Sequence, residues 1–197
     1  MSSSTVVVGL PGGLSRTLTT ELGAVTVAPG SELPANIKCA VIVVDPCPPP
    51  VDAVALSGDD WRRLVDEPMW RTLTALQGAR AGFSAGGRIV VVVPTIGMAG
   101  APGLVAYTTA VEGIRAMVKS AARQWASQGI GANLVAVPLS MFSDDTAAAG
   151  HLTAAAVTVD STLIHTVAES VKFLLRSDLD HLAGETIVAD GGSVMLP

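Results

Sequence analysis

The sequence predicts an α/β protein in which a doubly wound parallel sheet lies between two layers of helices. Short apolar runs alternate with segments of helical periodicity along the whole chain, which is the pattern of a parallel sheet. The runs are rich in valine and only 15% of the residues are charged, as expected for strands buried on both faces. The 197 residues contain no internal repeat and no linker, so we assign 1–197 to a single domain.

The first half of the chain opens with strands and one short helix. Val6–Val8 is a β-branched run and predicts the first strand. Leucines then recur at helical spacing and predict a helix that ends at Gly23, a residue suited to the end of a helix. Ala24–Ala28 and Cys39–Val44 predict two further strands, and the second of them stops at a run of prolines that no sheet could continue.

A longer helical segment follows this proline run. Asp59 or Asp60 can cap a helix that begins near Trp61. Pro68 lies inside the segment and is predicted to kink or break the helix, because proline lacks the backbone N–H. The segment should end at Gly86-Gly87. The second half continues the alternation with a strand at Arg88–Val93, a glycine-rich loop at 97–103, a helix at Tyr107–Ser127, a strand at Ala132–Val137, a loop at Pro138–Thr153, a helix at Leu163–Arg176 and a strand at Thr186–Ala189.

The composition excludes several classes of function. The net charge is −5 and no dense cluster of Lys and Arg occurs, which argues against a nucleic-acid partner. The longest apolar runs are strand-sized, far below the roughly eighteen residues of a membrane helix, so no membrane association is expected. Cys39 and Cys47 have no further ligands at metal-binding spacing, so we predict no metal site, and the lack of a disulfide framework favours the cytoplasm.

The second half carries an ordered series of motifs. They are Gly87-Arg-Ile-Val, Gly103-x-x-Ala-Tyr107, the run Lys119–Ile130, Asn133, Phe173–Asp178 and the segment Gly184–Gly192. In this order the motifs resemble the short-chain dehydrogenase/reductase family, and within it the 3-oxoacyl carrier-protein reductases. The resemblance covers residues 87–197 well and implies a Rossmann-like, three-layer αβα fold and oxidoreductase chemistry with NAD or NADP.

The resemblance also implies four catalytic groups, and most of them are missing here. The family uses a Tyr, a Lys four residues later, a Ser on the preceding strand and an Asn on an earlier helix. Tyr107 occupies the first position, but the others are Val111, Pro94 and a site near Pro68. Thr95 could supply a hydroxyl beside the missing Ser. Without a nearby cation little phenolate forms at neutral pH, so Tyr107 and Thr95 are expected to be vestiges, and we favour a buried Tyr107 with a satisfied hydroxyl.

The cofactor-binding turn implied by the resemblance is also incomplete. Gly9 and Gly13 match the first two of the family's three glycines, but the third is Ser15, whose side chain would press on the contact between helix and strand. Pro11 removes a possible N–H donor. We therefore treat Gly9 and Gly13 as vestiges of a dinucleotide site and expect no cofactor, with NAD or NADP as the alternative if the site still works.

One strand–helix unit of the N-terminal half is predicted to be missing. Only about ten residues separate the strand Ala24–Ala28 from the strand Cys39–Val44, and a crossover helix alone needs at least ~10–12 residues. The second strand also ends in Pro29-Gly30, where the family has an acidic residue for NAD or an Arg for NADP. In the family this unit forms a wall of the adenine pocket.

The parts of the sequence that serve assembly in the family are kept. There, the helix that starts at the Tyr packs with its neighbour across a two-fold axis, and the last strand forms a second interface. The helix Tyr107–Ser127 and the C-terminal strand retain suitable small and apolar residues. We therefore expect a non-catalytic subunit that assembles with itself or with an active relative. The alternatives are an NAD(P)(H)-dependent oxidoreductase that acts on a carbonyl or alcohol through Tyr107, and a small-molecule binding protein.

Overall fold

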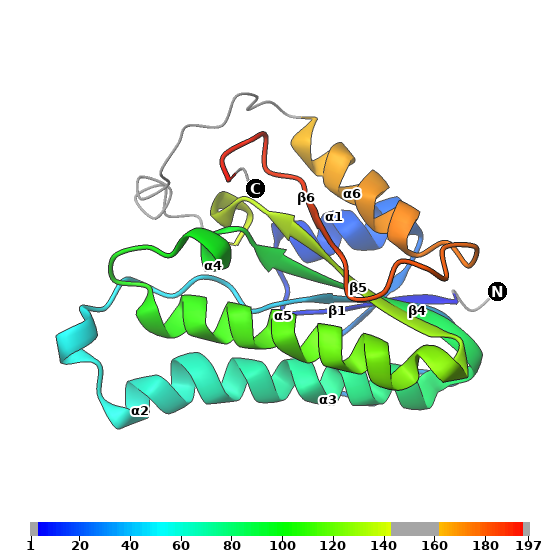
Figure 1. The fold of residues 1–197 in the computed structure, drawn as a ribbon, viewed down its shortest axis with the longest axis horizontal. Coiled ribbons are helices and arrows are strands. Elements are labelled where there is room, and N and C mark those ends of the chain that lie inside the picture. Colours follow the sequence, from blue (N-terminus) through cyan, green and yellow to red (C-terminus); the bar gives the residue numbers. More distant parts are fainter. Residues whose placement is uncertain (1–3, 143–161, 195–197) are drawn as a thin grey trace.

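Six parallel strands form the centre of the protein, with helices on both faces (Figure 1). The computed structural model describes residues 4–142 and 162–194. The strand order β2-β1-β3-β4-β5-β6 confirms the predicted doubly wound parallel sheet. The strands are β1 (Thr5–Val8), β2 (Val25–Val27), β3 (Ile37–Val43), β4 (Phe83–Pro94), β5 (Ile130–Val137) and β6 (Thr186–Val188).

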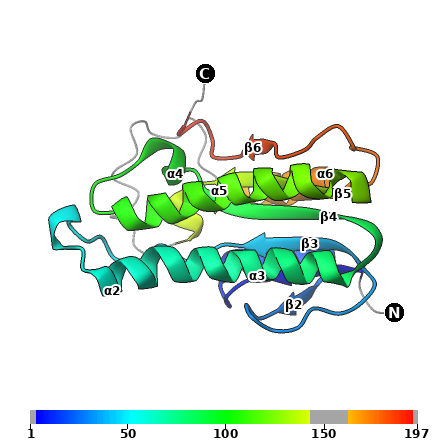
Figure 2. The same cartoon turned by 60° about the horizontal axis from the view of Figure 1, so that its bottom comes forward.

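The helices form two layers. Helices α3 and α5 pack side by side on one face of the sheet, and α1 and α6 pack together on the other (Figure 2). No described helix is long and apolar enough to cross a bilayer. The helices are α1 (Gly13–Leu22), α2 (Gly58–Trp61), α3 (Glu67–Gly82), α4 (Ile96–Ala99), α5 (Val105–Trp125) and α6 (Leu163–Leu174).

The valine-rich strands supply the core, as the composition predicts. Ile89 to Val93 of β4 and Leu134 to Val137 of β5 are fully buried, because helices cover both faces of these central strands. The prediction that Gly23 ends the first helix is also confirmed. Its φ of 56° is left-handed, and its N–H donates to the Thr20 carbonyl oxygen at 3.2 Å.

The connection between β2 and β3 confirms that one strand–helix unit is absent. Residues 28–36 carry the chain across β1 without a helix, so that β1 pairs with β2 on one side and with β3 on the other. The strand β2 is therefore at the edge of the described sheet, and Val25 on it is 44% exposed. A further strand–helix unit of the family's kind would cover this edge.

The sequence predicts that Pro68 kinks or breaks its helix, and the structure shows no break. The chain stays helical from Gly58 to Gly82, because a π-helical turn over Arg62–Asp66 lies directly before α3. A π turn shifts the hydrogen bonds by one residue, so Glu67 N–H donates to the Arg62 carbonyl oxygen. Pro68 is then in the first turn of α3, a position at which a helix tolerates a residue without a backbone N–H.

The cap of this helix is one turn earlier than predicted. Ser57, rather than Asp59 or Asp60, is the N-cap residue, and its Oγ accepts from Asp60 N–H at 3.1 Å. Asp60 completes the capping box by accepting from Ser57 N–H at 3.3 Å. A Ser followed three residues later by a carboxylate is the signal that the sequence contains for this start.

Other boundaries differ by short distances. Strand β4 begins at Phe83, so the Gly86-Gly87 pair that should end the helix lies within the strand instead. The predicted loop 97–103 contains most of the short helix α4. Helix α5 begins two residues before Tyr107. The predicted loop Pro138–Thr153 lies outside the described residues from position 143 onward.

Candidate functional site

The carboxyl edge of the sheet carries the residues that the sequence singles out. The turn 9–15 follows β1, Asp45 lies just beyond β3, and Thr95 follows β4 directly. In doubly wound sheets this edge is where ligands bind. Tyr107 reaches the same edge from the first turn of α5.

Tyr107 is buried and its hydroxyl is bonded to the backbone. The residue is 4% exposed, and the hydroxyl donates to the Asp45 carbonyl oxygen at 3.1 Å. Burial, followed by the negative charges of Cys47 and Asp45, raises the pKa of the Tyr107 phenol well above its ordinary value. The phenol therefore keeps its proton at neutral pH.

The two positions at which the resemblance implies a Lys and a Ser carry Val111 and Pro94, neither of which is a cation that could reverse this effect. Val111, one turn along α5, is 1% exposed and packs against Gly97 so closely that a Cβ on Gly97 would lie 2.6 Å from Val111 Cγ1. Pro94 is the last residue of β4 and pairs with Val137 in the sheet. Neither side chain can donate a hydrogen bond or lower the pKa of a phenol.

Thr95 lies inside the protein. It is fully buried, and its N–H donates to the Val137 carbonyl oxygen at 2.8 Å. Within the part of the chain that the structure describes, the Thr95 hydroxyl has no hydrogen-bond partner. No hydrogen bond between described residues links Thr95 to Tyr107.

We predict that Thr95→Val stabilises the protein by about 1 kcal/mol, because it removes a buried hydroxyl without a partner and keeps the side-chain shape. Urea unfolding of both proteins measures the difference. Thr72→Val is the matched control, since the Thr72 hydroxyl donates to the Pro68 carbonyl oxygen at 3.0 Å and its loss should destabilise. A loss of stability on Thr95→Val would show that this hydroxyl has a partner in solution.

The glycine turn after β1 is held together by packing. A Cβ on Gly9 would lie 2.9 Å from Ser15 Oγ and 3.1 Å from Val43 Cβ, so the site requires glycine. Ser15 Oγ donates to the Leu10 carbonyl oxygen at 3.0 Å, which ties the turn to the first turn of α1. Gly13, in contrast, has open space where a side chain would stand.

An ion pair that the sequence analysis missed crosses this edge of the sheet. Arg71 on α3 binds the Asp45 carboxylate through both Nε and Nη2, with Nε at 2.9 Å from Oδ2. Nη1 of Arg71 lies 3.5 Å from Glu67 Oε2. The two partners are 26 positions apart, and no local pattern links them. The feature of the sequence that could have indicated this pair is the position of Asp45 at the end of a buried strand. A side chain on a helix that packs against the sheet can reach an acidic residue there.

Three neighbouring hollows lie at the carboxyl ends of β1 and β3, and a further one, of 350 Å³, lies beyond β6. The first, of 190 Å³, lies between the turn 10–15, Pro46 and Phe142. The second, of only 10 Å³, lies next to Gly9, and the third, of 210 Å³, lies next to Tyr107. Leu10 and Pro46 line both the first and the third, and the Asp45–Arg71 ion pair lines both the second and the third.

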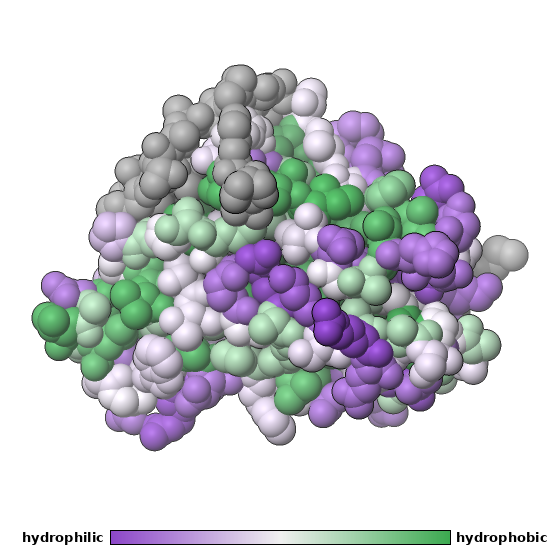
Figure 3. All heavy atoms as spheres, in the orientation of Figure 1, coloured by the Kyte–Doolittle hydropathy of each residue, from purple (hydrophilic) through white to green (hydrophobic). Residues whose placement is uncertain are grey.

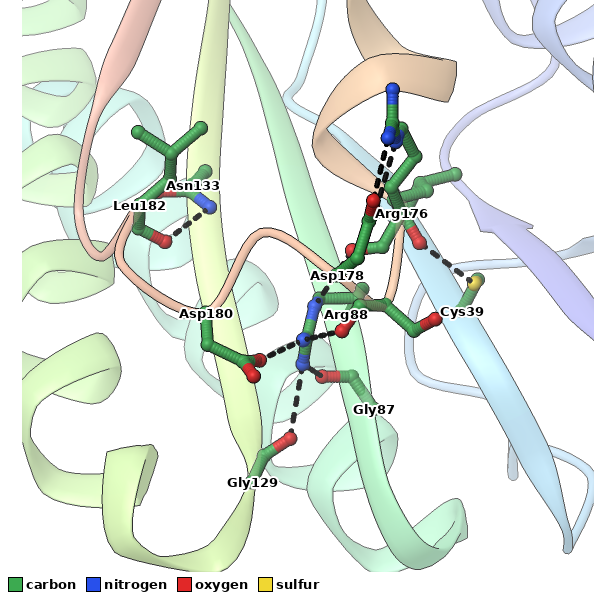
Figure 4. Close-up of polar contacts among 11 residues, drawn as sticks. Cys39, Gly87, Arg88, Gly129, Asn133, Arg176, Asp178, Asp180 and Leu182 are labelled. Carbon is green, nitrogen blue, oxygen red and sulfur yellow. Dashed lines mark hydrogen bonds and ion pairs between the residues drawn. The ribbon is translucent and has the colours of Figure 1, made fainter.

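The motif residues Arg88 and Asn133 are far from this edge and have structural partners. Arg88 points from β4 to the opposite, amino edge of the sheet, where it binds four carbonyl oxygens and Asp180 (Figure 4). Asn133 on β5 donates to the Leu182 carbonyl oxygen at 2.9 Å and accepts from Glu185 N–H at 2.9 Å (Figure 4 shows the first of these bonds). Both residues fasten the segment that leads into β6.

Comparison with known proteins agrees with this fold. A family model described as enoyl-(acyl carrier protein) reductase matches residues 36–194, which is most of the chain. No curated protein matched the chain. The match begins at the end of the shortened β2–β3 connection and includes every motif from Gly87 onward. The chain therefore belongs to the short-chain dehydrogenase/reductase family.

Proposed function

We propose that the protein is a non-catalytic member of its family that acts as a subunit, assembled with itself or with an active relative. The observation that carries the proposal is the Tyr107 hydroxyl, which is buried and donates its proton to the Asp45 carbonyl oxygen. A general acid/base has to exchange its proton with the substrate, and efficient catalysis needs a pKa near the working pH. The pKa of Tyr107 is shifted away from that range.

The described residues also do not fit a dinucleotide. The hollows beside the glycine turn and beside Tyr107 have 190 and 210 Å³, whereas sites for drug-sized ligands start at about 300 Å³, and a 350 Å³ hollow beyond β6 shares no lining residue with them. The side chains of the Asp45–Arg71 ion pair and of Leu10 and Pro46 stand in the walls that these hollows share, which is where a dinucleotide would have to pass. Strand β2 ends at Val27 and is followed by Pro29-Gly30, where neither residue has a side chain that could bind a ribose hydroxyl or phosphate.

Exposed apolar side chains support assembly. Trp70 on α3 is 64% exposed and Val105 at the start of α5 is 42% exposed, on the helical layer that the sequence analysis assigns to an interface. Figure 3 shows apolar residues gathered at the end of the molecule where the 3₁₀ turn Ala53–Ala55 and the start of α5 lie. Val54 there is 93% exposed. Exposed apolar side chains that gather in one region are typical of surfaces that bind another protein.

Titration with NADH and NADPH tests the loss of catalysis. We expect no saturable change in nucleotide fluorescence and no hydride transfer to carbonyl substrates, since the Tyr107 phenol is buried and the hollows beside it among the described residues are small. An active family member under the same conditions is the positive control. Micromolar binding together with turnover that disappears in Tyr107→Phe would overturn the proposal.

Light scattering coupled to size-exclusion chromatography tests the assembly. We expect the protein, alone or co-purified from its native host, to elute as an oligomer. Trp70→Glu should reduce assembly at least about tenfold, because it would place a charge in the proposed apolar contact between subunits, where the exposed Trp70 lies. Thr20→Glu is the matched control, as Thr20 is exposed on α1 at the opposite face. A protein that stays monomeric and is recovered without a partner would contradict the assembly.

A further inference from the structure

We propose that the 210 Å³ hollow beside Tyr107 binds a small cyclic monocarboxylate, whose acidic group is held by Arg63. The proposal does not depend on assembly or on the loss of catalysis. It rests on the walls of the hollow, on the π-helical turn that places Arg63, and on the unused hydrogen-bond donors of the Arg63 guanidinium.

The walls of the hollow are apolar and stiff. Five of the nine lining residues are Leu or Pro, and three of these five are prolines, whose rings cannot change rotamer: Leu10, Pro46, Pro48, Leu64 and Pro68. A site that is formed before the ligand arrives loses little entropy on binding. The volume is below that of a drug-sized site, which selects a ligand with a single ring.

The π-helical turn brings Arg63 to the same side of its helix as Arg71. In a regular α-helix, residues eight positions apart point in directions about 80° different. A π turn contains one extra residue, so Arg63 and Arg71 behave as if seven positions apart, within about 20° of each other. Both arginines accordingly line the hollow.

The two arginines differ in how many of their guanidinium N–H groups remain available to a ligand. Arg71 is committed, because Nε and Nη2 bind Asp45 and Nη1 faces Glu67. Arg63 forms an ion pair with Asp60, through a single hydrogen bond from Nη2 to Oδ1 at 2.9 Å. Four of its five N–H groups remain for a ligand. Its side chain is 58% exposed, so the guanidinium lies at the rim, where an acidic group could keep contact with water.

The charges around the hollow select a single carboxylate. Asp45 also lines the wall, and its charge is neutralised by Arg71. A ligand with a second acidic group would place that group against apolar walls or near the Asp45 carboxylate, at a desolvation cost. A ligand with one carboxylate can bind the Arg63 guanidinium through that group and place its apolar ring between the prolines.

Ligand-observed and protein-observed NMR titrations test the proposal with benzoate and cyclohexanecarboxylate. Benzamide, which is neutral and nearly the same shape as benzoate, is the control ligand. We expect benzoate to bind at least about tenfold more tightly than benzamide, as a charge-assisted contact predicts. Arg63→Ala should abolish that difference. Arg62→Ala is the matched control, because Arg62 is 67% exposed, pairs with Asp59 and does not line the hollow.

Equal binding of benzoate and benzamide would overturn the proposal, and so would a preference for benzoate that survives in Arg63→Ala. Leu64→Trp provides a second route, since it fills the apolar wall and should abolish binding of both acids. If that variant fails to fold, Pro48→Trp fills the same hollow from a loop. Binding of NADH or NADPH is measured separately, so failure here leaves the proposed function untouched.

Discussion

Arg88→Met is expected to destabilise the protein by about 3–5 kcal/mol, the cost of breaking a buried charged network. The Arg88 side chain is 9% exposed and donates to the carbonyl oxygens of Arg176 at 3.0 Å, Gly87 at 3.1 Å, Gly129 at 3.0 Å and Ser177 at 2.8 Å. Methionine keeps the length of the side chain but cannot donate. Four carbonyl oxygens from three segments then lose a donor at once.

Urea unfolding of the variant measures this loss, and Arg176→Met is its control. Arg176 pairs with Asp178 at the surface, where the two side chains are 55% and 61% exposed. Such an exposed pair contributes little to stability, because solvent screens the attraction between the two charges. The comparison separates the buried Arg88 from the exposed Arg176, whose backbone carbonyl oxygen Arg88 binds. A cost below about 1 kcal/mol for Arg88→Met would mean that the network does not hold the C-terminal segment.

The second large effect concerns alkaline stability and Tyr107. Burial raises the pKa of this phenol in the folded protein above its ordinary value, so the unfolded chain loses its proton first as the pH rises. The contribution of Tyr107 to the free energy of unfolding is fully present below about pH 10, the ordinary tyrosine pKa. Above that pH it falls by about 1.4 kcal/mol per pH unit, until the folded phenol also ionises.

Comparison of the wild type with Tyr107→Phe isolates this contribution from other groups that titrate at alkaline pH. At neutral pH the wild type should be more stable by about 1 kcal/mol, because Phe cannot make the hydrogen bond to Asp45. Above about pH 10 the difference should shrink and then reverse sign. Urea unfolding at a series of pH values measures it. A difference that grows with pH would mean that the folded protein stabilises the phenolate.

The sequence predicts the architecture well because its signals are local. The valine runs, the leucines of α1 and Gly23 at its end each act within a few residues of the chain. The shortened connection between β2 and β3 is likewise visible as a count of residues. These features allow a correct prediction of the sheet and of its missing unit without any knowledge of distant contacts.

The features that shape the candidate site depend on distant contacts or on subtle backbone geometry. The Asp45–Arg71 pair joins the end of β3 to the middle of α3, and only the packed layers bring the two together. The π turn before Pro68 replaces the expected break, because one extra residue in a turn resolves the same steric conflict at a lower cost than ending the helix. Sequence reasoning identifies the proline but cannot choose between these solutions.

The resemblance to a family identifies important residues without giving their roles in this chain. Arg88 and Asn133 belong to the motifs, and the structure assigns them to the amino edge and to the fastening of β6. Tyr107 belongs to the same motifs and lies at the carboxyl edge. The motifs do not say at which edge of the sheet a residue lies. That position distinguishes the residues that hold the fold together, at the amino edge, from the residue that catalysis would need, at the carboxyl edge.

Direct titration of the phenol tests the central claim, that Tyr107 is not poised for catalysis. Tyr107 is the single tyrosine of the chain, so the ultraviolet absorbance of tyrosinate reports on this residue alone. We predict that the folded protein shows no tyrosinate through the ordinary range around pH 10, and that the signal appears only with alkaline unfolding. Reversible ionisation in the folded protein below about pH 10 would contradict the claim, because it would reveal a phenol activated for acid/base chemistry.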